Sequence, residues 1–155
     1  MRVLPTRSGF TFVELMIVVA LIGVLAALGV SNWYEMQLKA RRTEPMVCLQ
    51  GIADAEVAYE AVTSEYAQGA NNPGPPIGKQ PKAWDREADG WKDLGWEPDG
   101  LVRCSYISTA HGGGSWFRVD AYCDIDGDDD SAIIRYYSAH GGSTAWFSDL
   151  YPNRY

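Results

Sequence analysis

Four sets of residues in this 155-residue chain could carry chemistry, and each set has a different sequence context. One acid, Glu14, lies inside an otherwise uncharged run from Phe10 to Val30. Carboxylates alternate between Asp124 and Asp130, two histidines each precede a glycine cluster, and three cysteines are spread along the chain. A carboxylate in hydrocarbon is costly and usually marks a pairing or functional site, so the position of Glu14 needs an explanation.

The acidic cluster is the sharpest candidate for a metal site. Clustered carboxylates suit a hard cation such as calcium, which takes about six to eight oxygen ligands. The EF-hand pattern does not fit, because Gly127 is the fourth residue of the run rather than the sixth and no bidentate glutamate follows at the twelfth position. Two interpretations stay open: a solvated Asp-Gly turn between strands, or a calcium site. The ligands of that site would be Asp124, Asp126, Asp128 and Asp130.

The histidines favour turn chemistry over catalysis. Three glycines follow His111, as in the oxyanion loop of esterases, but the chain has neither a Gly-x-Ser-x-Gly elbow nor a His-Glu-x-x-His helix. The same His-Gly-Gly sequence recurs at His140 between two apolar segments, so turns explain both occurrences. We therefore predict no catalytic residues.

Composition limits the classes of partner. The chain is long enough for one modest domain plus a targeting segment, and its formal net charge is -7. Its clustered cations are confined to Lys39, Arg41 and Arg42, so we expect no direct binding of nucleic acid. The cysteines fit no paired Cys-x-x-Cys metal pattern, which favours an exported chain with one disulfide and one remaining thiol.

Three kinds of N-terminal segment are compared with the first thirty residues: a secretory signal peptide, a plain transmembrane helix and a leader followed by an apolar helix. A secretory signal peptide has a shorter apolar stretch, and an acid near its start is out of character. A plain transmembrane helix needs about 20 apolar residues, which the run supplies, but it leaves Glu14 unexplained. Arg2 and Arg7 form a short basic leader that ends at Gly9. The residues around this glycine resemble the processing site of type IV prepilins and type II secretion pseudopilins. The stretch is Gly9-Phe10-Thr11-Phe12-Val13-Glu14-Leu15.

This resemblance implies cleavage between Gly9 and Phe10 by a membrane-embedded prepilin peptidase and methylation of the new Phe10 amine by the methyltransferase. In that family the glutamate is thought to meet the N-terminal amine of a neighbouring subunit as the helix leaves the bilayer, and buried charges are tolerated when paired. A tolerated acid near the headgroups is the alternative for Glu14. The implied partners are other copies of the chain or related pilins in a homo-oligomeric or mixed fibre, and an inner-membrane assembly platform.

Residues 32–66 resemble the second half of the pilin N-terminal helix. Pro45 inside this pattern predicts a kink between Arg41 and Pro45. One apolar stripe, spaced by four and three residues in turn, is expected to cover a sheet, and Cys48 is interpreted as a small buried apolar residue within it. The predicted stripe is Cys48, Ile52, Ala55, Tyr59, Val62 and Tyr66.

The remaining residues predict a loop followed by a sheet. Proline and glycine are frequent in residues 67–100, which predicts a connecting loop, and three tryptophans there indicate that it packs down. Such a loop either forms subunit contacts, as in pilins, or only covers a sheet edge. Alternating apolar segments at 101–108, 116–123, 132–138 and 145–148 predict an antiparallel meander. A turn centred near Gly113 would place Cys104 opposite Cys123, close enough for a disulfide.

The expected fold class is α+β and pilin-like, with a long N-terminal helix packed against a four-stranded antiparallel sheet. Its predicted parts are a leader (1–9), a transmembrane and assembly helix (10–31), an amphipathic helix (32–66), a loop (67–100) and a sheet region (101–155). The first functional hypothesis is a type IV pilus subunit, major or minor, for adhesion, motility or DNA uptake. A type II secretion pseudopilin is the second, and a membrane-tethered calcium-binding or enzymatic domain is the third. The expected location is the bacterial inner membrane, as a single-pass protein, and then an extracellular pilus or a periplasmic pseudopilus. No cofactor is expected apart from calcium.

Overall fold

The computed structural model describes residues 9–75 and 78–155. The predicted leader therefore lies outside the described residues except for Gly9, and so do its two arginines, Arg2 and Arg7. The chain divides into two compact units, one ending at Gln37 and one from Leu38 to Tyr155. Each is considered by itself.

Helix α1 (Phe12–Arg41) makes up most of the described part of the first unit and enters the second. Leucine and alanine, which are strong helix formers, are frequent in it. Large apolar side chains from Phe10 to Val30 are 44% to 77% exposed. The helix is long and apolar enough to cross a membrane, and its most apolar window has a mean hydropathy of 2.7. This segment is built for an apolar environment that the chain itself does not supply.

The helical run is interrupted where a kink is predicted. Helix α1 ends at Arg41, a turn follows at residues 42 and 43, and α2 (Glu44–Thr63) begins directly afterwards. Pro45 occupies the first turn of α2, where its missing N–H would have had no partner within the helix. The proline thus starts a new helix instead of bending a continuous one.

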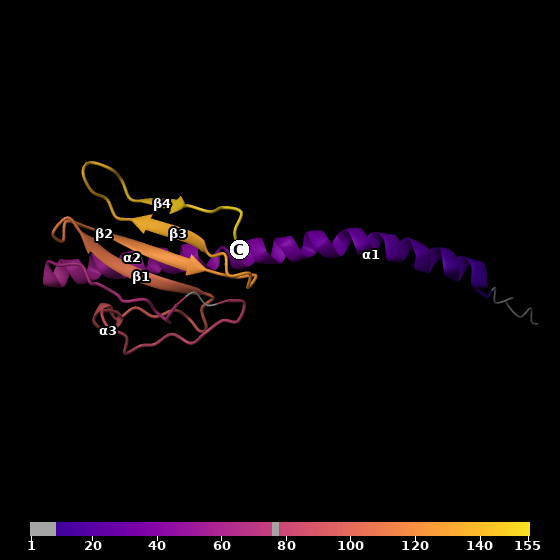
Figure 1. Cartoon of the computed structure of the whole chain (residues 1–155), viewed down its shortest axis with the longest axis horizontal. Helices are drawn as coiled ribbons and strands as arrows, with labels where there is room; N and C mark the ends of the chain where they lie inside the picture. The colour runs from indigo at the N-terminus through magenta and orange to yellow at the C-terminus, as the bar shows by residue number, and fades with distance from the viewer. Residues whose placement is uncertain (1–8, 76–77) are drawn as a thin grey trace, which may run out of the picture. The chain divides into compact units, whose positions relative to one another are not determined.

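Four strands form one antiparallel sheet in the order β1-β2-β3-β4, as predicted (Figure 1). They are β1 (Cys104–His111), β2 (Trp116–Cys123), β3 (Ala132–Tyr137) and β4 (Trp146–Asp149). Strand β1 begins three residues later than expected, and the others match within about one residue, as usual for strand ends. Glycines with positive φ occupy all three hairpin connections, at Gly112 to Gly114, at Gly127, and at Gly141 and Gly142.

Helix α2 covers one face of the sheet and contacts β2 and β3 (Figure 1). The face of α2 that is buried differs from the predicted stripe by a rotation of about one residue around the helix axis. Val62, predicted to be inside, is 86% exposed, so this prediction is wrong, whereas Cys48 is partly buried against the core and not fully buried as predicted. The predicted Ile52 is buried, while Ala55 and Tyr59 are partly buried at the margin of the core. The buried residues of α2 are Pro45, Leu49, Ile52, Ala53 and Glu56.

The loop between α2 and β1 packs down, as its tryptophans predict. Trp91, at the start of the short helix α3 (Trp91–Leu94), is buried, and its indole donates a hydrogen bond to the Ala70 carbonyl at 2.5 Å. The Trp84 ring meets Trp91 and Trp96 edge-on, with centroids 4.9 and 5.3 Å away. The Gly90 that precedes α3 has a φ of 79°, and a Cβ there would collide with the Gln68 carbonyl, so only glycine fits.

The same loop covers the outer edge of β1. Asn72 and Tyr106 exchange backbone hydrogen bonds of 3.0 and 2.8 Å, and Lys82 and Val102 exchange a pair of 2.9 Å. These bonds satisfy backbone groups that an edge strand would otherwise present to another chain. The edge-covering interpretation of the loop is therefore supported for this part of it.

Candidate processing and assembly site

The start of α1 brings Glu14 onto the backbone of Thr11. The Glu14 carboxylate accepts hydrogen bonds from the amide and the hydroxyl of Thr11, both at 2.9 Å. In return the Glu14 amide donates to the Thr11 hydroxyl at 3.3 Å. This reciprocal pattern is a capping box, which satisfies amides that a helix start leaves without partners.

The capping box gives Glu14 a local role that the sequence analysis missed. Its signal was present, because a threonine three residues before a glutamate at the start of an apolar helix is the capping-box spacing. The carboxylate is thereby held at the N-terminal end of α1, where the helix dipole favours a negative charge. Gly9 and Phe10, the predicted cleavage pair, lie just before this helix and are exposed.

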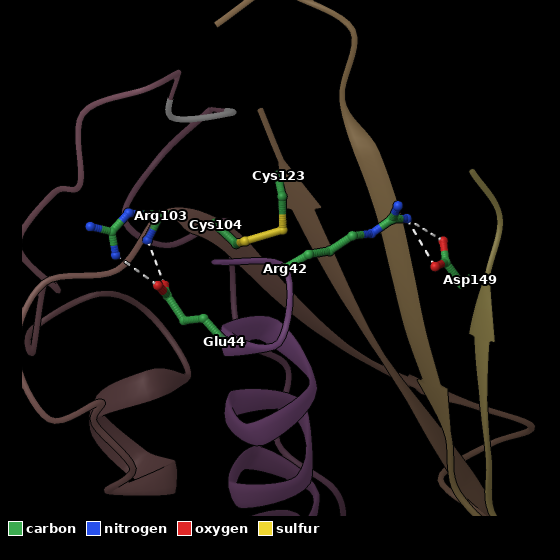
Figure 2. Close-up of a disulfide and its surroundings, with 6 residues drawn as sticks. All are labelled: Arg42, Glu44, Arg103, Cys104, Cys123 and Asp149. Carbon is green, nitrogen blue, oxygen red and sulfur yellow. Dashed lines mark hydrogen bonds and ion pairs between the residues drawn. A yellow bond between two sulfur atoms is a disulfide. The ribbon is translucent and has the colours of Figure 1, made fainter. Parts of the chain in front are cut away.

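Two charged residues at the break between α1 and α2 tie the helix to the C-terminal segment and to the start of the sheet (Figure 2). The buried Arg42 guanidinium contacts both Asp149 carboxylate oxygens, at 2.7 and 2.9 Å, and donates to the carbonyls of Tyr151 and Pro152. Arg42 therefore fixes the end of β4 and the chain beyond it, and it is not part of a cationic surface.

Glu44 provides the second tie, at the start of β1 (Figure 2). Its carboxylate accepts a 2.7 Å hydrogen bond from the Arg103 amide and a 3.2 Å bond from the Arg103 guanidinium. The two edge strands of the sheet are thus both connected to the helix break, by side chains two residues apart. A charge-assisted bond at each edge defines where α2 lies on the sheet.

The predicted disulfide between Cys104 and Cys123 is present. The two residues are directly opposed in the register of β1 and β2, with Cα atoms 4.4 Å apart. Cys48 is the free cysteine, and burial raises the pKa of its thiol, which lowers its reactivity.

The structure gathers three of the four predicted metal ligands. Carboxylate oxygens of Asp124, Asp126 and Asp128 all lie within 4.8 Å of one another. Asp124 also accepts from the amides of Gly127 and Asp128, at 2.8 and 3.2 Å, which is the geometry of an Asx turn.

The fourth predicted ligand is committed elsewhere. The Asp130 carboxylate pairs with Arg154 at 2.7 Å, and its amide donates to Asp128. Burial and the neighbouring Asp128 raise the pKa of Asp126, as expected where like charges converge. Three oxygen donors from a short loop fit a hard cation, and calcium binding stays a prediction.

The two histidines lie on either side of one indole. The Trp116 ring stacks on His111 and on His140, with both centroid separations 4.3 Å. The Nδ1 of His140 donates to the Ser138 carbonyl at 2.9 Å. The repeated His-Gly-Gly sequence thus brings two hairpin turns together through an aromatic stack, which agrees with the turn interpretation.

One buried acid was missed altogether. Glu56 is fully buried, accepts a 2.9 Å hydrogen bond from the Ala67 amide and also accepts from the Ser108 hydroxyl. Burial raises the pKa of its carboxyl, and the two hydrogen bonds oppose that shift. It joins α2, the loop and β1 at one point.

Comparisons with known proteins agree on the N-terminal region. A family model described as the prokaryotic N-terminal methylation motif matches residues 4–30. The type IV major pilin protein PilA of Myxococcus xanthus (strain DK1622) is 36% identical over 70 residues, which are 45% of this chain and 32% of that protein. Fimbrial protein Q of Moraxella bovis is 29% identical over 116 residues, which are 74% of this chain and 64% of that protein.

The chain thus spans about a third of one of these relatives and just under two thirds of the other. No solved structure matches. The long apolar helix, the break that leads into α2, and the four-stranded sheet form the α+β, pilin-like architecture that the N-terminal resemblance predicts. The chain therefore carries a prokaryotic N-terminal methylation motif and is homologous to a type IV major pilin and to a fimbrial protein.

Proposed function

We propose that this chain is a structural subunit of a type IV pilus. One observation carries the proposal: the methylation motif includes the start of an apolar helix whose large side chains are exposed and whose first turn holds a single acid, Glu14. Such a surface needs either lipid or other copies of itself as its surroundings. A fibre subunit encounters both in succession, first in the membrane and then in the fibre.

Processing would create the second half of the Glu14 site. Residues 1–9 are proposed as the leader, removed by a prepilin peptidase between Gly9 and Phe10, with methylation of the Phe10 amine. The ammonium of one subunit then pairs with Glu14 of its neighbour. An unpaired carboxylate is costly in hydrocarbon, so this pairing favours assembly and fixes the axial register of adjacent helices. The capping box keeps the carboxylate at the helix start until then.

The location and the remaining partners follow from the same model. Residues 10–31 are proposed to cross the inner membrane once before assembly, with residues 38–155 outside the lipid. The subunit would then join a fibre of identical or related subunits through an inner-membrane assembly platform. The printed descriptions of the relatives, a type IV major pilin and a fimbrial protein, favour an external pilus over a periplasmic pseudopilus.

The experiment compares Glu14→Ala with Glu65→Ala in a host with the prepilin peptidase and the assembly machinery. Glu65 is an exposed acid just beyond α2 and serves as the control. We expect both variants to be cleaved after Gly9 and inserted into the membrane. Filaments sheared from the cells should fall about tenfold or more only for Glu14→Ala, as for loss of a buried charge pair.

Electron microscopy and mass spectrometry give separate readouts. The mass of the mature subunit reports cleavage and methylation at Phe10, while microscopy reports filaments. Normal filament yield from Glu14→Ala would remove the assigned pairing. Intact leader in the wild-type chain, or cleaved subunits that never leave the membrane, would contradict the pilus assignment as a whole.

A further inference from the structure

The outer side of α2 carries an apolar surface that continues onto both neighbouring segments. One hollow, of about 530 Å³, lies between α2 and the segment from Trp96 to Val102. Another, of about 480 Å³, lies between α2 and Phe147 of β4. Val47 and Gly51 line both hollows, so Val47 forms a ridge between them. We call these two hollows and their ridge the double groove.

The double groove is more apolar than a helix surface in water is expected to be. Its ridge residue Val47 is 74% exposed, and Leu101 on one side is 58% exposed. Met46 and Phe147, on the other side, are each 43% exposed. Exposed apolar residues gathered in one place, in contrast to single ones, mark an interaction site. The partner must therefore present large apolar side chains.

The rim of the double groove is acidic. Glu44 and Glu97 each have an internal cation, Arg103 and Arg86 respectively. Asp54 and Asp99 lie on opposite sides of the ridge, and neither pairs with a cation among the residues that the structure describes. The surface thus favours a partner whose apolar residues are flanked by positive charge.

A segment of this same chain has that composition. Trp33 and Met36, on the last turns of α1, are each 61% exposed, and they lie three residues apart and so share a helix face. Lys39 and Arg41 follow within two turns. Tryptophan and methionine are effective anchors in apolar hollows.

We propose that the double groove receives the Trp33–Arg41 segment of a second copy of the chain. Trp33 and Met36 enter the two hollows on either side of Val47, and the basic end of the segment lies against Asp54 and Asp99. The inference rests on the proposed function and adds a second contact between subunits, distinct from the Glu14 pair. It is a helix-in-groove contact with polar edges.

The first test compares Val47→Lys with Val62→Lys in the full-length processed chain. Both valines are exposed on α2, at 74% and 86%, but only Val47 lines the double groove. Neither substitution removes a buried group, and tryptophan fluorescence checks that each subunit is folded. We expect filament yield to fall about tenfold for Val47→Lys and less than about twofold for Val62→Lys. Equal yields from the two variants would overturn the proposal.

A charge swap tests the identity of the occupant. Asp99→Lys should lower filament yield several-fold, and adding Arg41→Glu should restore at least half of it, because the two signs are exchanged together. A double variant that is no better than Asp99→Lys alone would show that the Trp33–Arg41 segment is not the partner.

A cross-link distinguishes failure of this inference from failure of the proposed function. Val47 is exposed on the ridge, so Met36→Cys combined with Val47→Cys and Cys48→Ala should form a disulfide between two copies under mild oxidant. The readout is a dimer on a non-reducing gel of membranes as well as of filaments. If wild-type cells make no filaments, the pilus proposal fails while the dimer still supports the contact. Filaments without the dimer overturn only the contact.

Discussion

The two long helices of this chain contain the same apolar residue types but differ in how far they bury them. From Phe12 to Val30, α1 is apolar on all sides, and its large apolar side chains are exposed. Helix α2 also contains valine, leucine, isoleucine and alanine, but it buries one face against β2 and β3. A helix that is apolar all round needs surroundings from outside the chain, whereas one with a single apolar face can be satisfied by its own sheet.

The break at residues 42 and 43 separates these two behaviours. Arg42 and Glu44 attach α2 to the edges of the sheet, and the disulfide holds β1 to β2 beside them (Figure 2). The folded stability of residues 38–155 should therefore depend on internal contacts, and that of the apolar half of α1 on its surroundings.

Arg42→Ala should destabilise the unit from Leu38 to Tyr155 by about 3 to 4 kcal/mol, because it leaves the partly buried Asp149 and two carbonyls without their donor. Five of the six tryptophans lie between residues 84 and 146, so fluorescence in urea reports this unit. Far-UV circular dichroism in detergent should show α1 still helical.

Arg86→Ala is the matched control for Arg42. It removes an ion pair with Glu97 whose side chains are 75% and 47% exposed, and should cost less than about 1 kcal/mol. If both arginine variants unfold at the same urea concentration, the helix break is not the anchor described above.

Removing the disulfide should cost about 3 kcal/mol, since the bond joins residues 19 apart and restricts the unfolded chain. The variant is Cys104→Ala with Cys123→Ala, measured by urea unfolding, with Cys48→Ala as the control. Membrane insertion of α1 should be unaffected. Equal stability of the double variant and the control would refute a structural role for this bond.

Glu56 should make the stability of the unit depend on pH. Its folded pKa is raised above the unfolded value of about 4.3, so its contribution is fully present below that value and is lost as pH rises through the folded pKa. Glu56→Gln retains acceptors and donors for Ala67 and Ser108 without the charge. The free energy of unfolding of the variant should therefore exceed that of the wild type by roughly 1 to 2 kcal/mol at pH 8 and should equal it near pH 4.

Glu56→Ala is the contrasting variant. It leaves the Ala67 amide and the Ser108 hydroxyl without a partner and should lose roughly 1 to 3 kcal/mol at both pH values. Urea unfolding at each pH measures both variants. A Glu56→Gln difference that does not change between pH 4 and pH 8 would contradict the assigned burial of the charge.

Calcium should have the smallest effect. If Asp124, Asp126 and Asp128 bind the ion, calcium at about ten times its Kd stabilises the unit by about 1.4 kcal/mol, and calorimetry shows heat of binding. Asp126→Asn should abolish the response and relieve some like-charge repulsion. Asp130→Asn, at the acid paired with Arg154, should retain most of the response to calcium. Absence of heat at millimolar calcium would remove the site.

Local and periodic features were predictable from the sequence. The meander follows from alternation and from glycine clusters, and the register of its first hairpin placed Cys104 opposite Cys123. Pro45 indicated where the helix changes, although the sequence predicted a kink and the structure has a turn between two helices. The stripe on α2 was misplaced because small and aromatic residues occur on several faces, and only packing decides which face is covered.

Residues whose partners are far away in sequence could not be predicted. Arg42 looked like part of a basic cluster, but its partner, Asp149, is 107 positions away. Glu56 was not singled out in the sequence, and its partners, Ala67 and Ser108, lie 11 and 52 positions away. Neither the spacing of residues nor the composition of the sequence indicates these two contacts.

The methylation motif, the apolar segment, a change of helix near Pro45 and the order of strands could all be read from the sequence. Each of these depends on neighbours within a few residues, through helix capping, turn geometry or periodic burial. The buried face of α2, the contacts of Arg42 and Glu56, and the exposed apolar residues beside acids were fixed by the packing of the folded chain. Those outcomes depend on distant segments meeting in space, which the packing of the whole unit sets.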